Sequence, residues 1–339
     1  MQHVAIDLGG RESQICVRSA EGEILEEKRY PTRLLEKLMT RWPQSRIIVE
    51  TSAEAFRVAD AAKAAGHQVR VVPATLVKTL GVGARGVKTD RRDARTLSEV
   101  STRIDLPSVH VPSELARELK TMCGNRESLV ECRTRLINNV RGWMRTQLWR
   151  IRTGVTSSFP TRLRESAMTN AVSLPDHVEQ TLQVVDQLTT QIRTATQRLE
   201  EIAEKHPVCK RLMTVPGVGA ITAVRFLAAL DEASRFRNAH AAQSYVGLTP
   251  GEHSSSDQQH RTSITKAGPA PLRRVLIQAA WTALRTRPHD PMVIWAQRIA
   301  ARKHKFIAVV ALARKLVGIL FALWRDGTSY QPHRGGATT

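Results

Sequence analysis

The sequence predicts an α/β domain with a mixed sheet, followed by an all-α region. Over residues 1–112, short apolar runs and helical stretches follow the order β-β-β-α-β-α-β-α, which is typical of a sheet with helices on its faces. Beyond residue 112, apolar residues recur every seven positions, and this spacing favours long helices. We predict four parts: the α/β domain at 1–112, a helical or coiled-coil segment at 113–205, a mainly helical C-terminal domain at 206–326 and a disordered tail at 327–339.

Five strands and three helices are predicted in the first part. The strand segments are short, apolar and rich in β-branched residues, and turn residues such as Gly22 separate them. The second helix is rich in alanine and is followed by Gly66, a residue type that commonly ends helices. The predicted strands are 3–8, 14–18, 23–30, 46–50 and 69–72, and the predicted helices are 32–41, 54–65 and 90–103.

Two heptad patterns define the middle segment. The first runs through Leu115, Met122, Leu129, Leu136 and Trp143. The second runs through Val178, Val185, Ile192 and Leu199, with Leu188, Ala195 and Ile202 at the other seam position. Such repetition favours a coiled coil or a long helical hairpin, and a helix in an intramolecular bundle explains it equally well. The coiled-coil interpretation predicts a homo-oligomer, either a dimer or a tetramer.

The third part, which starts at Pro207, combines helices with a polar loop predicted at 251–261. Its segment 215–219 reads Val-Pro-Gly-Val-Gly, as in the turn of a helix-hairpin-helix. Glycines in such a turn let the backbone approach a phosphate, and the following helix offers free N–H groups. An ordinary helix-capping turn has the same composition. The positive charge around the segment favours contact with a nucleic-acid backbone.

Charge indicates the class of partner. Of 339 residues, 42% are hydrophobic, as in a globular protein, and the formal net charge is +20. Residues 1–112 carry 18 basic and 14 acidic side chains, whereas residues 113–339 carry 33 and 17. This excess predicts binding to phosphate backbones, and DNA is the expected partner. A merely soluble basic surface is the alternative.

The spacing of the cysteines and the hydropathy of the chain indicate where in the cell the protein is located. The four cysteines contain no C-x-x-C pair, which predicts reduced thiols and argues against a structural zinc site. No run approaches ~20 uncharged apolar residues, and the N-terminus lacks a basic region followed by an apolar run. We therefore expect a cytoplasmic protein without a membrane segment.

Four carboxylates in the first part predict a metal site. In the first predicted strand Asp7 projects from the central, buried part of the sheet, where a carboxylate is costly unless a divalent cation compensates it. Glu50 ends the fourth predicted strand, where α/β sheets place their sites. Asp90 and Asp93 are three residues apart, so that a helix puts both on one face. Such oxygen ligands suit Mg²⁺ or Mn²⁺, and two such ions would serve phosphoryl transfer. Each acid alone has a plainer explanation, because Asp90 and Asp93 would also stabilise a helix N-terminus.

These motifs resemble a known family of enzymes. The segments VAIDLGG and KTDRRDA, with Glu50 between them, resemble the RuvC-like, RNase H-fold catalytic domain of the DEDD transposases, a family related to the Piv DNA invertase. The later segments TVPGVGAITA, YVGLTPGEHSS, ITKAG and LRRVLIQAAW resemble the C-terminal transposase domain of the same insertion-sequence family. The resemblance covers roughly residues 3–325, and the motifs are specific in combination.

The resemblance implies a chemistry and a set of partners. It implies metal ligands at Asp7, Glu50, Asp90 and Asp93, and a nucleophilic serine that its position assigns to Ser255, with Ser254 as the alternative. It further implies a phosphoserine-linked DNA intermediate and a guide RNA that pairs with donor and target DNA. The chain departs from the usual family pattern at Ser256, where glycine is common, and at Pro269, where asparagine is common.

Three other functions fit parts of the sequence. An actin-like sugar kinase also begins with an Asp-Leu-Gly-Gly turn, but it would need further glycine-rich loops where this chain is arginine-rich. A Holliday-junction resolvase would share the catalytic domain without the helical insert or the serine loop. A decayed nucleic-acid-binding protein would keep the fold alone. The residues favour a DNA transposase or recombinase that cleaves and rejoins strands by metal-assisted transesterification.

Overall fold

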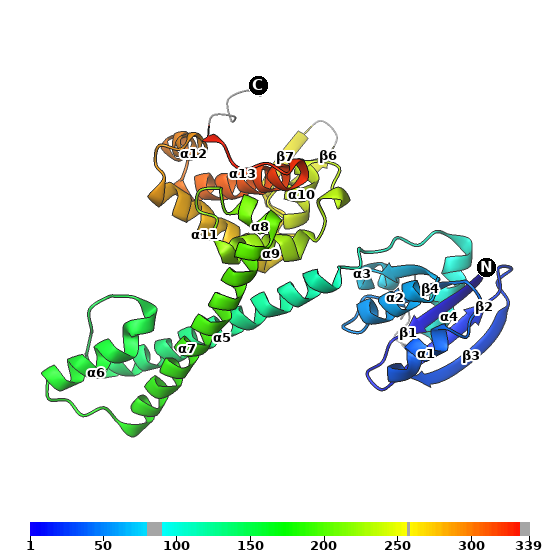
Figure 1. Cartoon of the computed structure of the whole chain (residues 1–339), viewed down its shortest axis with the longest axis horizontal. Coiled ribbons are helices and arrows are strands. Elements are labelled where there is room, and N and C mark those ends of the chain that lie inside the picture. Colours follow the sequence, from blue (N-terminus) through cyan, green and yellow to red (C-terminus); the bar gives the residue numbers. More distant parts are fainter. Residues whose placement is uncertain (80–89, 256–257, 333–339) are drawn as a thin grey trace. The chain divides into compact units, whose positions relative to one another are not determined.

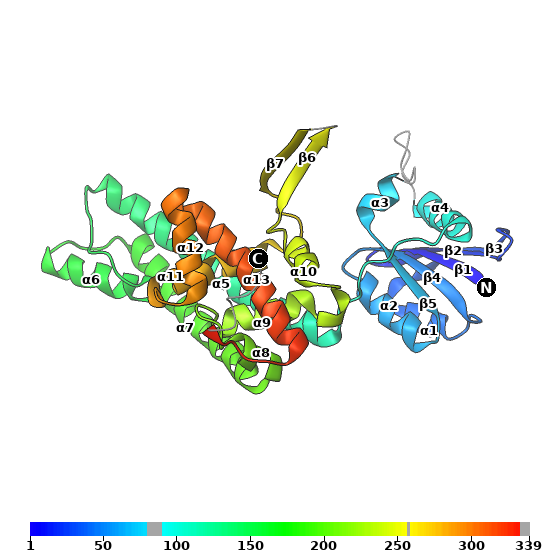
Figure 2. The same cartoon turned by 90° about the horizontal axis from the view of Figure 1, so that it is seen from above.

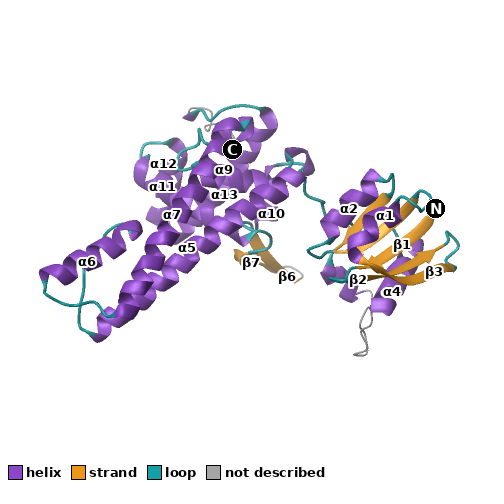
Figure 3. Ribbon diagram, turned by 60° about the horizontal axis from the view of Figure 1, so that its bottom comes forward, coloured by secondary structure: helices purple, strands orange, loops and turns teal. Residues whose placement is uncertain are grey.

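The computed structural model describes residues 1–79, 90–255 and 258–332, while the side chains of residues 77–79, 90, 252–255 and 258–261 lie outside the description (Figure 1). The chain divides into two compact units, Met1–Pro112 and Ser113–Thr339. The first is a mixed α/β unit and the second is mainly helical, as predicted. Figure 3 shows this division by secondary structure.

A five-stranded sheet forms the first unit, with the strand order β3-β2-β1-β4-β5. Strands β1 to β3 are antiparallel neighbours, whereas β1, β4 and β5 run parallel. Its strands are β1 (Gln2–Asp7), β2 (Glu12–Arg18), β3 (Ile24–Pro31), β4 (Ser45–Glu50) and β5 (Gln68–Val72). Its helices are α1 (Leu35–Met39), α2 (Ala55–Ala64), α3 (Ala74–Thr79) and α4 (Asp90–Arg103).

Helices cover both faces of this sheet. Val4 and Ile6 of β1 share one apolar core with residues of α1 and α2, while Ala5 shares another with Leu97 of α4. This division follows from the alternation of side chains along a strand. Figure 2 shows α1 and α2 on one side of the sheet and α4 on the other. All five predicted strands and all three predicted helices are present, with small shifts at their ends, and α3 is an addition.

A helical hairpin opens the second unit. It comprises α5 (Glu114–Thr146), α6 (Phe159–Thr169) and α7 (Asp176–Lys205), and α5 packs along α7 within the same chain. The seam predicted on α7 is buried from Val178 to Leu199. On α5 the buried residues are instead Ala116, Leu119, Cys123, Ile137, Val140 and Met144. Of the predicted α5 seam, Met122, Leu136 and Trp143 pack only at the margins of the cores, and Leu115 is 48% exposed, so the seam lies beside the buried face.

A polar stretch separates the two apolar ends of this hairpin. Arg126 donates to Thr196 Oγ1 at 2.7 Å, and Arg133 donates to Thr189 Oγ1 at 3.4 Å. Burial lowers the pKa of both guanidinium groups. The pairs bring early α5 against late α7, so the two helices are antiparallel.

The remaining helices enclose the core of the second unit. They are α8 (Pro207–Leu212), α9 (Ala220–Leu230), α10 (Ala239–Val246), α11 (Ala270–Thr286), α12 (Pro291–Arg302) and α13 (Lys305–Asp326). By length and hydropathy α13 could cross a membrane, against the sequence-based expectation. Nine of its residues are buried, however, and eight of them belong to this core, as in the central helix of a globular domain. In the segment predicted as a disordered tail, Tyr330 donates to Asp290 Oδ1 at 2.8 Å.

A two-stranded hairpin replaces the polar loop predicted at 251–261. Strands β6 (Pro250–Ser255) and β7 (Gln258–Ile264) pair in antiparallel register and project from the helices of their unit (Figure 2). Their sequences are polar and lack the apolar alternation that marks a half-buried strand. The two strands are joined by backbone pairing, and Ile264 at the base of β7 packs against the core of the unit.

Candidate active site

Asp7 and Glu50 lie at the same edge of the sheet. They are the last residues of β1 and β4, and the register Ile6↔Val49 makes them the next pair in these parallel strands. Asp7 is two residues beyond Ala5, and Glu50 two beyond Ile48, which both face α4. The alternation of side chains therefore places both carboxylates on the α4 face.

Asp93 is brought to the same face by α4. Its side chain is only 2% exposed, and α4 packs against β1, β2 and β4. Asp90 begins the helix, and its side chain lies outside the described part of the chain. The predicted carboxylates thus come from two strands and one helix, as the sequence indicated. Asp7 and Asp93 both have polar or electrostatic interactions in this structure.

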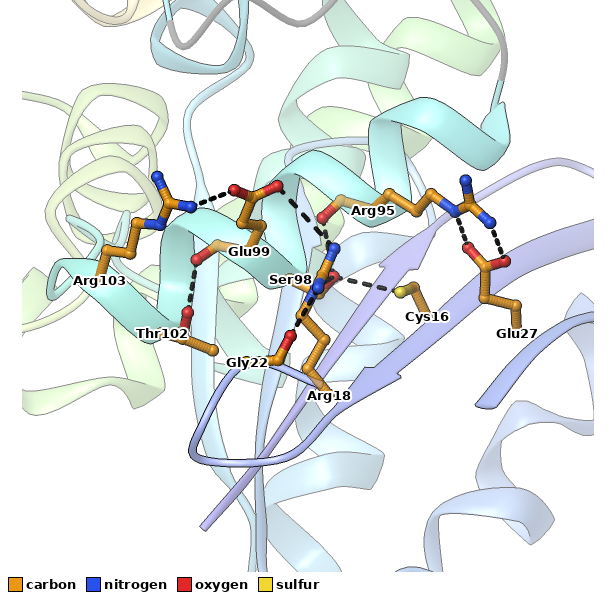
Figure 4. Close-up of polar contacts among 9 residues, drawn as sticks. All are labelled: Cys16, Arg18, Gly22, Glu27, Arg95, Ser98, Glu99, Thr102 and Arg103. Atoms are coloured by element: carbon orange, nitrogen blue, oxygen red, sulfur yellow. Dashed lines mark hydrogen bonds and ion pairs between the residues drawn. The ribbon is translucent and has the colours of Figure 1, made fainter. Parts of the chain in front are cut away.

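Arg91 of the motif KTDRRDA and Arg95, which directly follows the motif, connect α4 to the edge strand β3. Arg95 forms an ion pair with Glu27, and Arg91 donates to Glu27 Oε2 at 2.8 Å. Hydrogen bonding from Arg95, opposed in part by desolvation, lowers the pKa of Glu27 to about 2. Figure 4 shows Arg95 reaching Glu27 from α4. Arg91 and Arg95 therefore position the helix that carries Asp93.

A second group of contacts fixes the middle of α4. Arg18 of β2 donates to Ser98 Oγ at 3.0 Å and to the carbonyl oxygen of Gly22 at 2.7 Å. The Ser98 hydroxyl also lies 3.2 Å from Cys16 Sγ, and Arg18 forms an ion pair with Glu99 at 3.9 Å (Figure 4). Buried polar contacts of this kind specify one orientation, because a shifted helix would leave them unmade. The helix is consequently held in register with the sheet.

The turn after Asp7 is shaped by close backbone contact. A Cβ atom on Gly9 would lie 2.3 Å from the carbonyl oxygen of Glu12. The Thr32 hydroxyl donates to the carbonyl oxygen of Gly9 at 2.6 Å, and Ser13 Oγ lies 2.8 Å from Thr32 Oγ1. Gly9 is therefore required by the packing of the β1–β2 turn, and a nucleotide-binding loop is not needed to explain it.

The donor set suits a hard divalent cation, although it is not assembled around one here. Asp7, Glu50 and Asp93 offer carboxylate oxygens, which Mg²⁺ and Mn²⁺ prefer. Among the residues whose side chains the structure describes, which do not include Asp90, no three acidic, histidine or cysteine side chains are grouped closely enough to hold an ion. Carboxylates near one another repel when no cation lies between them. The residues therefore fit such an ion in chemistry and location, with Asp90 as the fourth ligand outside this description.

Ser254 and Ser255 lie at the far end of β6, and their side chains are outside the described part of the chain. In backbone register Ser255 pairs with Gln258, and His253 pairs with His260. Ser256 is outside the described residues altogether. The segments GLTP and ITKAG, which carried the resemblance in this region, form the two ends of the hairpin base.

Close glycine contacts lock the base of this hairpin. Gly247 and Gly268 both have positive φ values, and a Cβ atom on either would collide with the carbonyl oxygen of Ala267 or Tyr245 respectively. Arg273 donates to three carbonyl oxygens in these turns, at distances from 2.8 to 3.1 Å. Arg273 is thus a structural residue, although its charge suggested contact with a nucleic-acid backbone.

Gly217 is also used for internal packing. Its φ is +84°, and a Cβ atom there would lie 2.2 Å from the carbonyl oxygen of Ala279 on α11. Gly219 instead caps α9 with open space around it. Of the two glycines predicted to approach a phosphate, only Gly219 is clear of the protein's own backbone.

Thiol chemistry is disfavoured in the second unit. All four cysteines are free, which agrees with the predicted reduced thiols. Burial raises the pKa of Cys209 to about 12 and also raises the pKa of Cys123. A buried, protonated thiol is a poor nucleophile, so hydroxyl groups remain the candidate nucleophiles.

Sequence comparison relates segments of both units to transposases. Residues 4–147 match a DEDD transposase family model for IS110 elements, and residues 209–292 match the Transposase IS116/IS110/IS902 family. A probable family 20 transposase of Pseudomonas aeruginosa is 27% identical over 98% of this chain and 99% of its own length. The transposase of IS1328 from Yersinia enterocolitica is 23% identical over 96% and 98%. The transposase of IS1111A from Coxiella burnetii is 27% identical over 72% and 68%.

Proposed function

Because this chain belongs to the IS110 family of insertion-sequence transposases, whose two models together match more than half of it, we propose that it cleaves and rejoins DNA through a carboxylate-bound divalent metal and a serine nucleophile. The observation that carries the proposal is the placement of Asp7 and Glu50 at neighbouring parallel strand ends, on the face where Asp93 is buried. The mixed sheet supports an RNase H-like, RuvC-like assignment for this unit.

In this proposal Asp7, Glu50, Asp90 and Asp93 hold Mg²⁺ or Mn²⁺. When bound, the ion supplies Lewis-acid stabilisation of phosphate oxygens and lowers the pKa of a bound hydroxyl. The contribution of the chain is to place the ligands. The sheet fixes Asp7 and Glu50, and the ion pairs of Arg91 and Arg95 with Glu27 fix α4.

Ser255 is the proposed nucleophile, with Ser254 as the alternative. The serine oxygen attacks the phosphorus of a phosphodiester, a phosphoserine ester forms, and a deoxyribose oxygen leaves with the proton. Attack of a DNA hydroxyl on that ester rejoins the strand and returns the proton to serine. The location of these serines at the end of a projecting hairpin supports this role, because a projecting element reaches a bound strand.

The proposed partners are DNA, a guide RNA and further copies of the chain. Residues 113–339 carry 33 basic and 17 acidic side chains, which supports backbone contact with nucleic acid. The antiparallel α5–α7 hairpin is a surface on which copies could assemble through a coiled coil as dimers or tetramers. We propose that this assembly works on DNA in the cytoplasm.

The test is purification of the chain from cells, with sequencing of co-purified RNA and assay on element-end DNA. We expect a specific RNA, strand cleavage in Mg²⁺ and none in a chelator, and a covalent protein–DNA adduct. Cleavage without an adduct would favour a resolvase-like nuclease. Specific DNA binding without cleavage under any of these conditions would favour the decayed binding protein instead.

A further inference from the structure

An exposed basic and aromatic surface lies at the turn between α12 and α13. Residues 301–307 are all exposed, and among the described residues Phe306 has the most exposed aromatic side chain, at 64%. Ile307 beside it is 51% exposed. Large apolar side chains on a surface commonly mark a binding site, and this pair has no role in the proposed cleavage chemistry.

These two residues border an apolar groove of about 840 Å³. One wall is the base of the β6–β7 hairpin, with Pro250 and Ile264, and the other is formed by Trp295 of α12 and Val310 of α13. The volume is within the range of pockets that hold small organic groups. The groove is therefore large enough for flat, apolar chemical groups.

The rings around Phe306 form an aromatic platform. The ring of Trp281 meets that of Phe306 edge-on at 5.9 Å, and the His304 ring lies 5.0 Å away with an interplanar angle of 34°. These neighbours hold the phenyl ring while more than half of its side chain stays exposed. A fixed, exposed ring loses little conformational entropy when another ring stacks on it.

The charge around this platform is uniformly positive. Residues 291–325 contain seven arginine and lysine residues and no aspartate or glutamate. Lys305 Nζ lies 5.0 Å from the ring of Trp281, and Lys315 Nζ lies 4.4 Å from that of Trp295. Arg314 donates through Nε to Gln243 Oε1 at 3.1 Å, which fixes its guanidinium in the groove wall.

We propose that this groove binds unpaired nucleobases of single-stranded nucleic acid, with Phe306 as the stacking residue. Aromatic faces and cations side by side are the usual combination for single strands, because bases stack on the former and phosphates pair with the latter. A purely apolar protein segment would supply no counter-charge to the cations beside the groove, such as Arg314 and Lys315. The shared ligand is an unpaired base, whether in RNA or in melted DNA.

This inference rests on the proposed function, and it adds the place at which a single strand would bind relative to the proposed nucleophile. Pro250, in the groove, and Ser255 are the two ends of β6. Five strand steps separate them by about 17 Å. A strand whose bases stack in the groove would thus be held a short distance from the proposed nucleophile.

The test is binding of the full chain to labelled oligothymidylate, oligouridylate and a duplex of equal length, in a chelator so that no cleavage intervenes. We expect Phe306→Ala to weaken binding to single strands about tenfold, the scale of one lost base stack, with unchanged duplex binding. Phe306→Tyr should restore it. Met168→Ala, which removes an apolar side chain on α6 that is 83% exposed, is the control. A larger loss on oligouridylate would assign the groove to RNA, and a larger loss on oligothymidylate to DNA.

Photo-crosslinking with 5-iodouracil strands gives a direct readout, with expected attachment at Phe306 or Trp295. If Phe306→Ala leaves the affinity for single strands unchanged, the proposal is overturned, and the groove would instead be a binding site for a protein partner. Equal losses on duplex and single strands would overturn it as well, because they indicate backbone contact alone. These results are independent of cleavage, so failure of the groove leaves the proposed nuclease chemistry standing, and failure of cleavage leaves the groove standing.

Discussion

The two units of this protein hold their predicted functional side chains in opposite ways. In the first unit, Asp7 and Glu50 are the last residues of two neighbouring parallel strands. Asp93 is buried on α4, the helix that packs against these strands. In the second, the candidate serines lie at the end of a two-stranded hairpin that projects from its helices. The first unit is nearly balanced in charge, whereas the second has an excess of 16 positive charges.

This difference indicates a division of labour. Metal ligands require fixed positions, which a sheet and a pinned helix provide. A nucleophile that must meet a large polyanion is better placed on a projecting element within a positive surface. Substitutions in the two units should therefore give different failures, and each of the following experiments uses that contrast.

Replacement of the proposed nucleophile should have the largest effect. Ser255→Ala removes the attacking oxygen, so we expect no covalent protein–DNA adduct on denaturing gels, with DNA binding unchanged. Ser254→Ala, the adjacent substitution, is the matched control and should retain the adduct. If Ser254→Ala abolishes the adduct and Ser255→Ala keeps it, the two serines exchange roles.

Loss of a strand-end carboxylate should come next. Asp7→Asn keeps the size of the side chain and removes its charge, and we expect strand cleavage in Mg²⁺ to fall about 10³-fold, the scale of several kcal/mol of lost transition-state stabilisation. Asp105→Asn is the control in the same unit, since Asp105 pairs with Arg70 at a site 69% exposed. Full cleavage by Asp7→Asn would exclude the metal site.

Two glycine substitutions in the second unit compare a tightly packed position, Gly217, with one that has open space around it, Gly219. Gly217→Ala forces a Cβ atom against α11 at a positive φ, and we expect the free energy of unfolding to fall by about 3 kcal/mol. Gly219→Ala has open space and should cost less than about 1 kcal/mol, as a changed helix cap. Thermal unfolding checks both. Equal losses would contradict the tight contact with Ala279.

The smallest effect should be seen in the first unit and should depend on pH. Because Arg95 lowers the pKa of Glu27 from 4.5 to about 2, ionised Glu27 stabilises the fold above pH 4.5. That contribution is lost as the pH falls towards 2. Glu27→Gln should destabilise this unit by about 1–3 kcal/mol at neutral pH, and the difference from wild type should shrink in acid.

The control for this experiment is Glu26→Gln. Glu26 is 44% exposed and pairs with Lys28 on the surface, so its loss should change stability by less than about 1 kcal/mol. Urea unfolding at several pH values measures both variants. A gap between wild type and Glu27→Gln that stays constant down to pH 2 would refute the assigned pKa.

Much of the first unit could be predicted because its apolar residues recur with the spacing of strands and helices. Ile6, Ile48 and Val71 belong to short runs that only a buried strand explains, and the predicted helix over 90–103 has the bounds of α4. The position of Glu50 at a strand end followed from these strands, whereas Asp7, expected inside a strand that runs to Leu8, is the last residue of β1. The function of Arg91 and Arg95 did not, because their partner Glu27 lies in a distant, polar strand and ion pairing leaves no period in the sequence.

The second unit was harder to predict for two physical reasons. The buried face of α5 includes Ala116 and Cys123, small residues that a search for large apolar residues passes over. Strands β6 and β7 are held by backbone hydrogen bonds, so their side chains carry no apolar alternation. The roles of Arg273 and Gly217 depend on long-range contacts that only the folded chain shows.

The α5–α7 hairpin has a consequence for how such proteins change over generations. Leu119 and Cys123 of α5 share one core with Leu199 and Ala203 of α7, whereas the far end of the hairpin has a separate core around Phe159. Because both ends of the hairpin join the same core, the hairpin is equivalent to an insertion between two adjacent positions of the domain. Matched turns could be added to or deleted from both helices at little cost to the domain beneath them. The length of the hairpin can thus vary under natural selection, whereas the base of the hairpin, which shares the core of the unit, cannot.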